Sequence, residues 1–259
     1  MDVNQSVYQS VAHEYRWLEL WPPERLILER FKSQWHHMRV LDLGVGAGRT
    51  AYTFAAIAKE YVGVDYAPAM IDRCVELCGE SQNVHFYVCD ARDLSRFGDG
   101  SFDLVLFCWN GIDAVSHEGR QQVLVEVRRV LHSEGHFFFS THSVFEFPFR
   151  TEFPRIRMRA PLHSVYYWAK AATRAARLKW MYRKTDADAV RAGQYAVLSP
   201  PDHQYQLRAY YIKPEYQLRQ LDDAGFETLL VYDQFGHEVD ARTTEHPGYL
   251  YFLCRPARG

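Results

Sequence analysis

The stretch that decides the fold is Val40-Leu41-Asp42-Leu43-Gly44-Val45-Gly46-Ala47-Gly48-Arg49-Thr50, which places an acidic residue and three glycines between an apolar strand and a helix. Glycines let the backbone adopt positive φ and approach a ligand closely, and the first turn of the helix presents unpaired N–H groups. Asp42 precedes the first glycine by two positions. A carboxylate there would repel a pyrophosphate and attract a cation, so the stretch predicts a site for a positively charged nucleoside.

A second acidic residue follows at the spacing expected for a ribose contact. Tyr61 to Asp65 reads as a buried strand that ends in an acid, and Asp65 lies 21 residues after Gly44. A carboxylate at that position can accept hydrogen bonds from both ribose hydroxyls. An NAD-dependent oxidoreductase is a rival for this pattern, but its loop would read Gly-x-Gly-x-x-Gly, which this loop does not.

Further motifs continue in order along the chain, and together they resemble the class I S-adenosylmethionine (SAM) dependent methyltransferases. The motifs are Ala67-Pro68-Ala69-Met70-Ile71, Val88-Cys89-Asp90-Ala91-Arg92-Asp93-Leu94, the strand from Ser101 to Asn110, the helix from Gln121 to Leu131 and the strand from Gly135 to Ser140. Ser133-Glu134-Gly135 replaces the usual Pro-Gly-Gly of the family, which alters a surface turn and no catalytic group.

The N-terminal segment adds to the resemblance. Residues 7 to 20 carry apolar and aromatic side chains at helical spacing, and Pro22-Pro23 predicts a break before a second helix from Glu24 to Gln34. The segment around Tyr8 and Tyr15 is similar to a helix that folds over the cofactor in small-molecule methyltransferases. An amphipathic helix whose tyrosines pack on the sheet is the alternative interpretation.

The resemblance implies SAM as the cofactor and S-adenosylhomocysteine (SAH) as its product. The glycine loop would take the methionine and sugar side, Asp65 the ribose, and Asp90 with its neighbours the adenine. Trp109 and Asn110 would lie between cofactor and substrate, although Trp109 could equally be a core residue. The candidate cofactor-binding residues are Tyr8, Tyr15, Asp42, Gly44, Gly46, Gly48, Asp65, Tyr66, Asp90, Ala91, Arg92, Trp109 and Asn110.

His142 is the candidate general base. It directly follows the fifth strand, and an imidazole of near-neutral pKa can take a proton from a hydroxyl or an ammonium group. It could instead only hydrogen-bond the backbone or the substrate. Candidate substrate-binding residues are Asp113 and His117, in the loop after the fourth strand, and Tyr211 in a later strand.

The alternation of strands and helices predicts an α/β fold with a Rossmann-like, doubly wound, seven-stranded sheet whose last strand is antiparallel. After the fifth strand the pattern breaks, and a helix is expected from His163 to Lys184. We therefore expect N-terminal helices and a SAM-binding core in residues 1–144, a substrate-recognition insertion or lid in 145–202, and completion of the core sheet in 203–259. In this last part we expect strands at Tyr205 to Ile212, Glu227 to Tyr232 and Tyr249 to Cys254.

The cysteines and the apolar stretches of the chain indicate which compartment and which bound groups to expect. The 259 residues include five cysteines without a compact spacing pattern, which favours reduced thiols over a disulfide framework. Cys74 and Cys78 have no accompanying His or Cys cluster, so we expect no metal site. No signal peptide and no apolar stretch of about 18 residues is evident, and we expect a cytoplasmic protein without a membrane span.

Charge is unevenly distributed. Between Arg150 and Arg191 there are eleven Lys and Arg against three acids, while the whole chain has a net charge of −2. A basic segment of this kind is a solvated helix face or a surface that recognises an anion, such as a phosphorylated sugar, a carrier-linked acyl group, a membrane surface or RNA.

The sequence therefore predicts a SAM-dependent methyltransferase acting on an O or N nucleophile of a small-molecule metabolite, with an anionic or aromatic metabolite among the candidates. The aromatic residues of the insertion favour an apolar or ring-bearing acceptor. One alternative is an RNA or tRNA methyltransferase that grips phosphates with the basic insertion, although no RNA-binding module is recognisable and we do not expect a nucleic-acid partner. Another is a catalytically silent SAM-binding partner protein.

Overall fold

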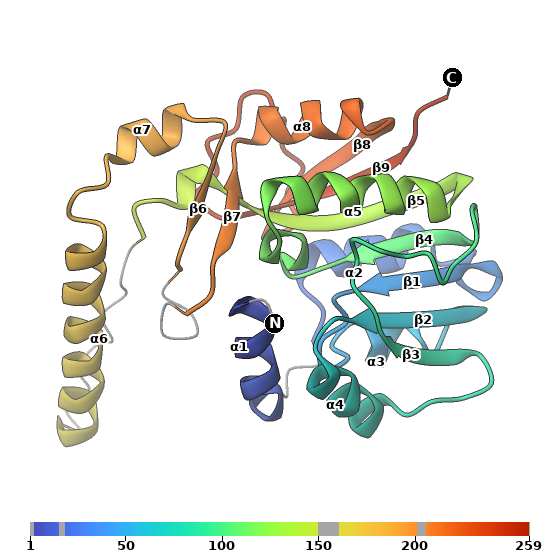
Figure 1. Cartoon of the computed structure of the whole chain (residues 1–259), viewed down its shortest axis with the longest axis horizontal. Helices are drawn as coiled ribbons and strands as arrows, with labels where there is room; N and C mark the ends of the chain where they lie inside the picture. Colours follow the sequence, from blue (N-terminus) through green and yellow to red (C-terminus); the bar gives the residue numbers. More distant parts are fainter. Residues whose placement is uncertain (1–2, 16–18, 150–160, 201–205, 259) are drawn as a thin grey trace.

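A central β-sheet organises the molecule (Figure 1), whose computed structural model describes residues 3–15, 19–149, 161–200 and 206–258, with the backbone only for 161–164. Five strands run parallel in the order β3-β2-β1-β4-β5. Beyond β5, β9 pairs antiparallel with both β5 and β8. The seven strands are β1 Arg39–Leu43, β2 Glu60–Asp65, β3 Val84–Val88, β4 Phe102–Phe107, β5 Leu131–Ser143, β8 Phe226–Asp233 and β9 Tyr249–Pro256. They form the predicted Rossmann-like sheet with its antiparallel last strand.

Two further strands extend this sheet. β7 (Ala209–Ile212) pairs parallel with the end of β5, opposite His142 and Ser143, and β6 (Tyr195–Leu198) pairs antiparallel with β7. The described residues therefore form a nine-stranded sheet rather than seven strands. β6 is short and half exposed, so it depends on its partner β7 more than on its own pattern. The predicted start of the β7 strand, Tyr205, lies outside the described residues.

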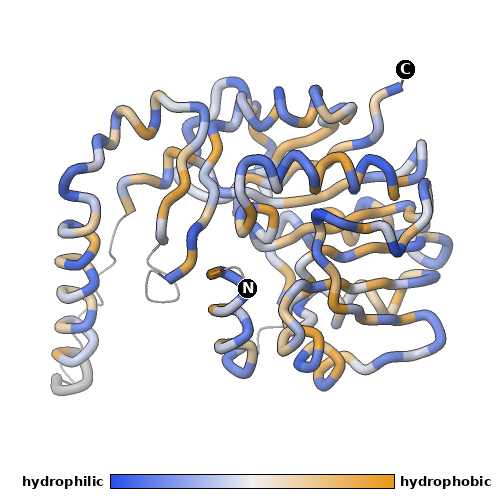
Figure 2. The backbone as a smooth tube through the Cα atoms, viewed as in Figure 1, coloured by the Kyte–Doolittle hydropathy of each residue, from blue (hydrophilic) through white to orange (hydrophobic). Residues whose placement is uncertain are grey.

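Alternation of side chains along the strands builds a core on each face of the sheet. Phe137 and Phe139 of β5 point into one hydrophobic cluster and Phe138 into the other. Helices α5 (His117–Val130) and α8 (Pro214–Asp223) contribute to the first cluster. The second cluster includes residues of α2 (Pro22–Arg30), α3 (Ala51–Phe54) and α4 (Pro68–Cys78). Figure 2 shows hydrophobic residues along the strands and on the helices that cover them.

Helix boundaries differ from the predicted ones in several places, among them the helix predicted from Gln121, which begins at His117. The N-terminal helix α1 spans Val3–Val11 and continues as a 3₁₀ turn, η1 (Ala12–Glu14), instead of running from residue 7 to 20. Tyr15 is extended, and residues 16–18 lie outside the described part of the chain. Helix α2 begins at Pro22 instead of after the prolines, because the first helical turn needs no N–H donor. The helix predicted from Thr50 is only the four-residue α3.

The segment after β5 contains a long helix that stands apart from the sheet. Helix α6 (Pro161–Met181), predicted from His163 to Lys184, is followed by α7 (Ala187–Ala192), and Figure 1 shows α6 at the far left, beyond β6 and β7. Shorter 3₁₀ turns are η2 (Trp35–His37), η3 (Gly111–Ala114) and η4 (Val144–Glu146). Among the described residues, no helix has the length and apolar character needed to cross a membrane. The boundaries proposed at residues 145 and 202 remain a prediction, and the β6–β7 pairing crosses the second of them.

We predict that Val127→Ala lowers the free energy of unfolding by about 2 kcal/mol, because Val127 is fully buried between α5 and the sheet. Urea unfolding of the full chain measures this change. Val125→Ala is the matched control, since Val125 lies on the same helix and is 61% exposed; it should change stability by less than about 0.5 kcal/mol. Equal effects of the two substitutions would contradict the described burial of α5.

Candidate active site

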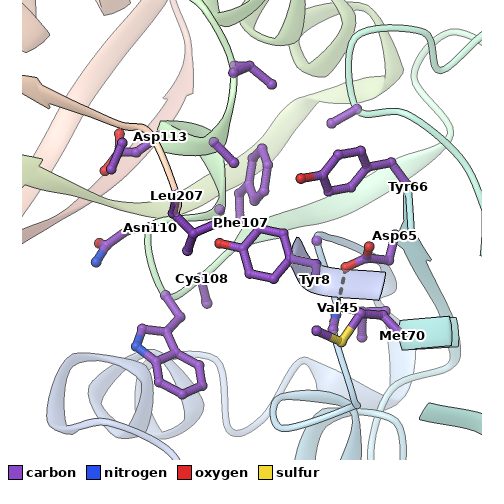
Figure 3. Close-up of a pocket in the computed structure, with 18 of the residues that line it drawn as sticks. Tyr8, Val45, Asp65, Tyr66, Met70, Phe107, Cys108, Asn110, Asp113 and Leu207 are labelled. Atoms are coloured by element: carbon purple, nitrogen blue, oxygen red, sulfur yellow. Dashed lines mark hydrogen bonds between the residues drawn. The ribbon is translucent and has the colours of Figure 1, made fainter. Parts of the chain in front are cut away.

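A cavity of about 790 Å³ opens at the carboxyl ends of the parallel strands (Figure 3). Its floor includes the turns after β1, β2, β3 and β4, and α1 together with residues 206–209 contributes to its walls. This is the edge where ligands bind in open α/β sheets, and the volume suits a nucleoside together with a second small molecule. All but three of the predicted site residues line this cavity; the exceptions are Gly48, His117 and Tyr211.

The glycine turn after β1 has the conformation that the sequence requires. Gly46 has φ +56°, and its N–H donates to Asp65 Oδ2 at 3.1 Å. A Cβ added to Gly46 would meet no atom nearer than 4.0 Å, so its missing side chain leaves open space at the cavity wall. Gly48, in contrast, packs under the turn, because a Cβ there would lie 2.5 Å from Cys78 Sγ and 2.8 Å from Cys74 Sγ. Its role is therefore to let α4 approach the loop.

Asp65 ends β2 with its carboxylate held in place by the backbone. Besides the bond from Gly46, Oδ1 accepts from the N–H of Ala67 at 2.9 Å. Burial raises the pKa of Asp65 to about 6, against these two hydrogen bonds, which lower it. A carboxylate that is fixed, buried and lining the cavity fits the ribose hydroxyls of a nucleoside.

Asp42 is also buried at the cavity wall. Its Oδ2 accepts hydrogen bonds from the hydroxyls of Thr50 and Tyr61. Burial raises the pKa of Asp42 to about 6. The predicted attraction of this residue for a cation thus coexists with a structural role, since its carboxylate ties β1 to the start of the next helix and to β2.

Asp90 and Arg92 form an ion pair at the cavity wall, in the turn after β3. The Arg92 guanidinium donates to both carboxylate oxygens of Asp90, at 2.6 to 3.0 Å, and the Arg92 N–H donates to Oδ1 at 2.9 Å. Burial acts to raise the pKa of Asp90, but the bonds from Arg92 outweigh it and the pKa is lowered. With Ala91 between them, the pair lines the side of the cavity predicted for the adenine.

Tyr8 of helix α1 and Tyr15, which follows η1, both line the cavity. In Figure 3 the Tyr8 ring lies between Asp65 and Tyr66 on one side and Leu207 and Asn110 on the other. Tyr8 meets Tyr66 edge to face, with ring centroids 6.3 Å apart. Gln5 Nε2 donates to the Tyr66 carbonyl at 2.6 Å, which helps to fasten the helix to the turn after β2.

The turn after β4 is strained where it meets the cavity. Trp109 and Asn110 have φ values of 51° and 59°, which two consecutive non-glycine residues rarely adopt. The Asn110 N–H donates to the Oγ of buried Ser140 at 2.8 Å, and Asn110 Nδ2 lies 3.4 Å from His142 Nε2. Trp109 is 39% exposed, so it is a wall of the cavity more than a core residue, and its ring meets Tyr15 edge to face.

His142 is oriented by a buried carboxylate. Asp113 Oδ2 lies 2.8 Å from His142 Nδ1 and also accepts from the His142 backbone N–H at 2.7 Å. Asp113 Oδ1 accepts from Arg120 at 2.6 Å, and both residues are at most 1% exposed. Because Nδ1 faces the Asp113 carboxylate, the arrangement favours the tautomer with a proton on Nδ1, which leaves Nε2 toward Asn110 Nδ2. Asp113, predicted to bind substrate, thus lies behind the imidazole as well as on the cavity wall.

The polar residues that support the Asp113–His142 pair were not predicted from the sequence. Arg120 donates further hydrogen bonds to Thr141 Oγ1 at 3.0 Å, to Gln217 Oε1 at 2.5 Å and to Gln220 Oε1 at 3.3 Å. Arg120 lies in α5 and Thr141 in β5. Gln217 and Gln220 lie in α8, 97 and 100 positions after Arg120. The available signal was the presence of two glutamines in the amphipathic pattern of α8, on the buried face.

His117 and Tyr211 lie near the site without lining the cavity. His117 Nδ1 is 2.8 Å from the Tyr210 hydroxyl, and its ring stacks on Tyr195 at 4.6 Å, so it packs β6 and β7 against the start of α5. The buried Tyr211 ring lies 4.7 Å from the ring of His142, behind the imidazole. Alternation along β7 therefore directs Tyr211 toward His142 and Tyr210 toward Arg120.

The chain matches a known family over the part that builds this cavity. Residues 40–135 match the family model described as a methyltransferase domain, which covers β1 through the start of β5. Residues 40–135, which carry the glycine turn and Asp65, are therefore similar to a methyltransferase domain, and the Rossmann-like fold extends beyond them.

Individual relatives support the family without defining the substrate. Uncharacterized methyltransferase YcgJ of Bacillus subtilis is 35% identical over 130 residues, 48% of this chain and 49% of that protein. The tRNA 5-carboxymethoxyuridine methyltransferase of Escherichia coli K12 is 31% identical over 107 residues, 40% of each chain. The matches thus span half or less of the length of these curated relatives.

Solved structures share the fold over nearly the whole chain. The CcbJ methyltransferase of Streptomyces caelestis has a TM-score of 0.63 at 16% identity and covers 99% of both chains. The 1,6-didemethyltoxoflavin-N1-methyltransferase of Burkholderia thailandensis, solved with its substrate and SAH, has a TM-score of 0.55 at 16% identity, over 99% of this chain and 88% of that one.

We predict that the affinity for SAH falls about fourfold when the pH is lowered from 7.5 to 5.5. The pKa of Asp65 is raised to about 6 and ribose hydroxyls donate to the charged carboxylate, so protonation below pH 6 removes the acceptor. Calorimetric titration at the two pH values measures the change. The Asp65→Asn variant should bind SAH more weakly at pH 7.5, and its SAH affinity should depend less on pH because Asn does not titrate. An affinity that is equal at both pH values would argue against Asp65 as the ribose contact.

Proposed function

We propose that this protein is a methyltransferase that moves a methyl group from SAM to an O or N nucleophile of a small-molecule metabolite. The observation that carries the proposal is one cavity that joins the cofactor motifs to an Asp-oriented histidine. Asp65, Gly46 and Asp90 lie at one end of this cavity, and His142 and Asn110 lie at the other. A cofactor and an acceptor held in such a cavity would be in line for a displacement reaction.

The residues present fit SAM on their own chemistry. Gly46 leaves open space beside Asp65, and the buried carboxylates at the carboxyl edge favour a cationic nucleoside over a dinucleotide. When bound, SAM supplies a methyl group activated by a positively charged sulfur. In this proposal Asp65 accepts from the ribose, Asp90 and Ala91 face the adenine, and Tyr8 and Tyr15 cover the cofactor together with α1.

His142 would act as the base. Nε2 carries the lone pair because Nδ1 faces Asp113, and the side chain is 14% exposed at the cavity wall. In the proposed reaction His142 Nε2 removes the proton that the nucleophile loses, and Asp113 stabilises the imidazolium that forms. The Asp113–Arg120 pair keeps the ring in one orientation, which matters because methyl transfer depends mainly on alignment.

A tRNA substrate is the second candidate. The Escherichia coli relative is a tRNA methyltransferase, and α6 carries Lys170, Arg174 and Arg177 at helical spacing. We rank it second because the described cavity has walls made of α1, residues 206–209 and aromatic rings, which suit a molecule enclosed on several sides. RNA binding that weakens steeply with salt would favour this candidate.

The first test is calorimetric titration of the full chain with SAM, SAH and NAD. Binding of the two sulfur nucleosides and not of NAD supports the cofactor assignment. Screening of small metabolites and of tRNA for SAH formation then follows. Failure of SAM and SAH to bind would refute the proposal, and SAM binding without turnover on any acceptor would favour a silent SAM-binding protein.

We predict that His142→Ala lowers turnover by 10²- to 10⁴-fold, roughly the contribution of a general base, while the affinity for SAM changes little. Steady-state SAH formation and calorimetry measure the two quantities. His132→Ala is the control, because His132 lies at the exposed beginning of the same strand. Parallel loss of SAM affinity and turnover in His142→Ala would remove His142 from the role of base.

A further inference from the structure

The guanidinium of Arg208 is the feature of the cavity that the proposed chemistry leaves unused. Arg208, Arg174, Arg92 and Arg49 line the cavity. Arg49 is paired with Glu24 at 2.7 Å, and Arg92 is paired with Asp90.

Among the described residues, the Arg208 side chain makes no hydrogen bond or ion pair, although its residue lines the cavity and is exposed. Within this described part of the chain, the guanidinium therefore has no carboxylate paired with it.

The backbone of Arg208 is held firmly in place by a buried side chain. Asn4, which is 4% exposed, donates from Nδ2 to the carbonyls of Ala114 and Arg208, each at 2.8 Å. The Arg208 N–H donates back to Asn4 Oδ1 at 2.9 Å. One amide thus joins α1, the η3 turn and the segment that leads into β7. The backbone of Arg208 at the cavity wall is therefore fixed in position by these hydrogen bonds.

The charges that line the cavity come from different parts of the chain. Asp42, Asp65 and Asp90 lie in or beside the cofactor motifs, and the charge of Asp113 is balanced by Arg120. Arg208 and Arg174 come from the segments that follow β5. The first group suits a cationic cofactor, and the two arginines suit an anion. Glu14 also lines the cavity, on η1, but its side chain is 66% exposed, so solvent screens its charge.

The register of β7 gives the approximate backbone separation between Arg208 and the candidate base. Tyr211 pairs with His142 across the sheet, and Arg208 precedes Tyr211 by three residues, roughly 10 Å of extended chain. Aromatic rings, those of Trp109, Tyr15 and Tyr249, line the same cavity. Trp109 is partly exposed, so it can offer a ring face to the ligand.

We propose that the acceptor is a ring-bearing acid, whose carboxylate or phosphate binds Arg208 while its nucleophile faces His142. The proposal rests on the methyltransferase function proposed above and adds the chemical class of its substrate. Arg208 and the Asn4 clamp select the acid, and the aromatic walls select the ring. Arg174 adds positive charge at the cavity wall.

Benzoate and its neutral isostere benzamide are the probes, because they share a ring and differ in the acid group. Each is titrated into the full chain, with and without saturating SAH, and binding is followed by tryptophan fluorescence and calorimetry. Benzoate should bind at least about fivefold more tightly than benzamide, as expected for a charge-assisted hydrogen bond. Equal binding, tighter benzamide binding, or no benzoate binding at tens of millimolar would overturn the proposal.

Substitutions test whether Arg208 causes the preference for benzoate over benzamide. Arg208→Ala should lose the preference for benzoate, Arg208→Lys should keep part of it, and Arg242→Ala, on an exposed loop outside the cavity, should leave it unchanged. Persistence of the preference in Arg208→Ala also overturns the proposal. Failure of SAH to bind would refute the methyltransferase function alone, because the benzoate titration without SAH tests Arg208 independently.

Discussion

The buried ion pair between Asp113 and Arg120 is the interaction on which the candidate site depends. Both charges are almost completely removed from water, and each is hydrogen-bonded to several partners. Removing one partner of such a pair leaves an uncompensated buried charge and costs about 3 to 5 kcal/mol. The pair therefore holds η3, α5, β5 and α8 in one arrangement, and the orientation of His142 follows from it. The orientation of the candidate base is thus a consequence of the need to pair two buried charges.

The proposed cofactor end of the cavity also contains buried charges, but these carboxylates are not neutralised in the same way. Asp65 and Asp42 are buried and form no ion pair with any described residue, and burial raises the pKa of both to about 6. Backbone N–H groups and neighbouring hydroxyls hold them in place. A positively charged nucleoside would supply the missing favourable interaction, so the energetic cost of these carboxylates in the free protein becomes binding energy for the ligand.

Coverage of the cavity comes from segments that are distant in sequence. Helix α1 reaches across the carboxyl edge, and Asn4 connects it to residues 114 and 208 through a single amide. His117 and Tyr195 stack to fix β6 and β7 on the other side. The segments that cover the cavity thus hold one another, while residues 40–135 carry the match to the methyltransferase domain model.

The sequence by itself determined the sheet and the cofactor end of the site. Strand and helix periodicity, the glycine spacing and Asp65 are local signals, because each depends on residues that are neighbours in the chain. The candidate base was found for the same reason, since His142 directly follows a clear strand. The short strand β6 was missed because pairing with β7 creates it, and the end of α1 was misplaced because a turn there brings Tyr15 against Trp109.

Only the tertiary structure decided which polar residues support the site. Arg120, Gln217 and Gln220 read as ordinary residues of amphipathic helices, and their roles depend on burial against partners about 100 positions away. The strained turn at Trp109 and Asn110, the clamp of Asn4 and the exposed guanidinium of Arg208 have no local sequence signature either. Periodicity reports which face of an element is buried, whereas the partner that a buried polar group meets is set by how the elements pack.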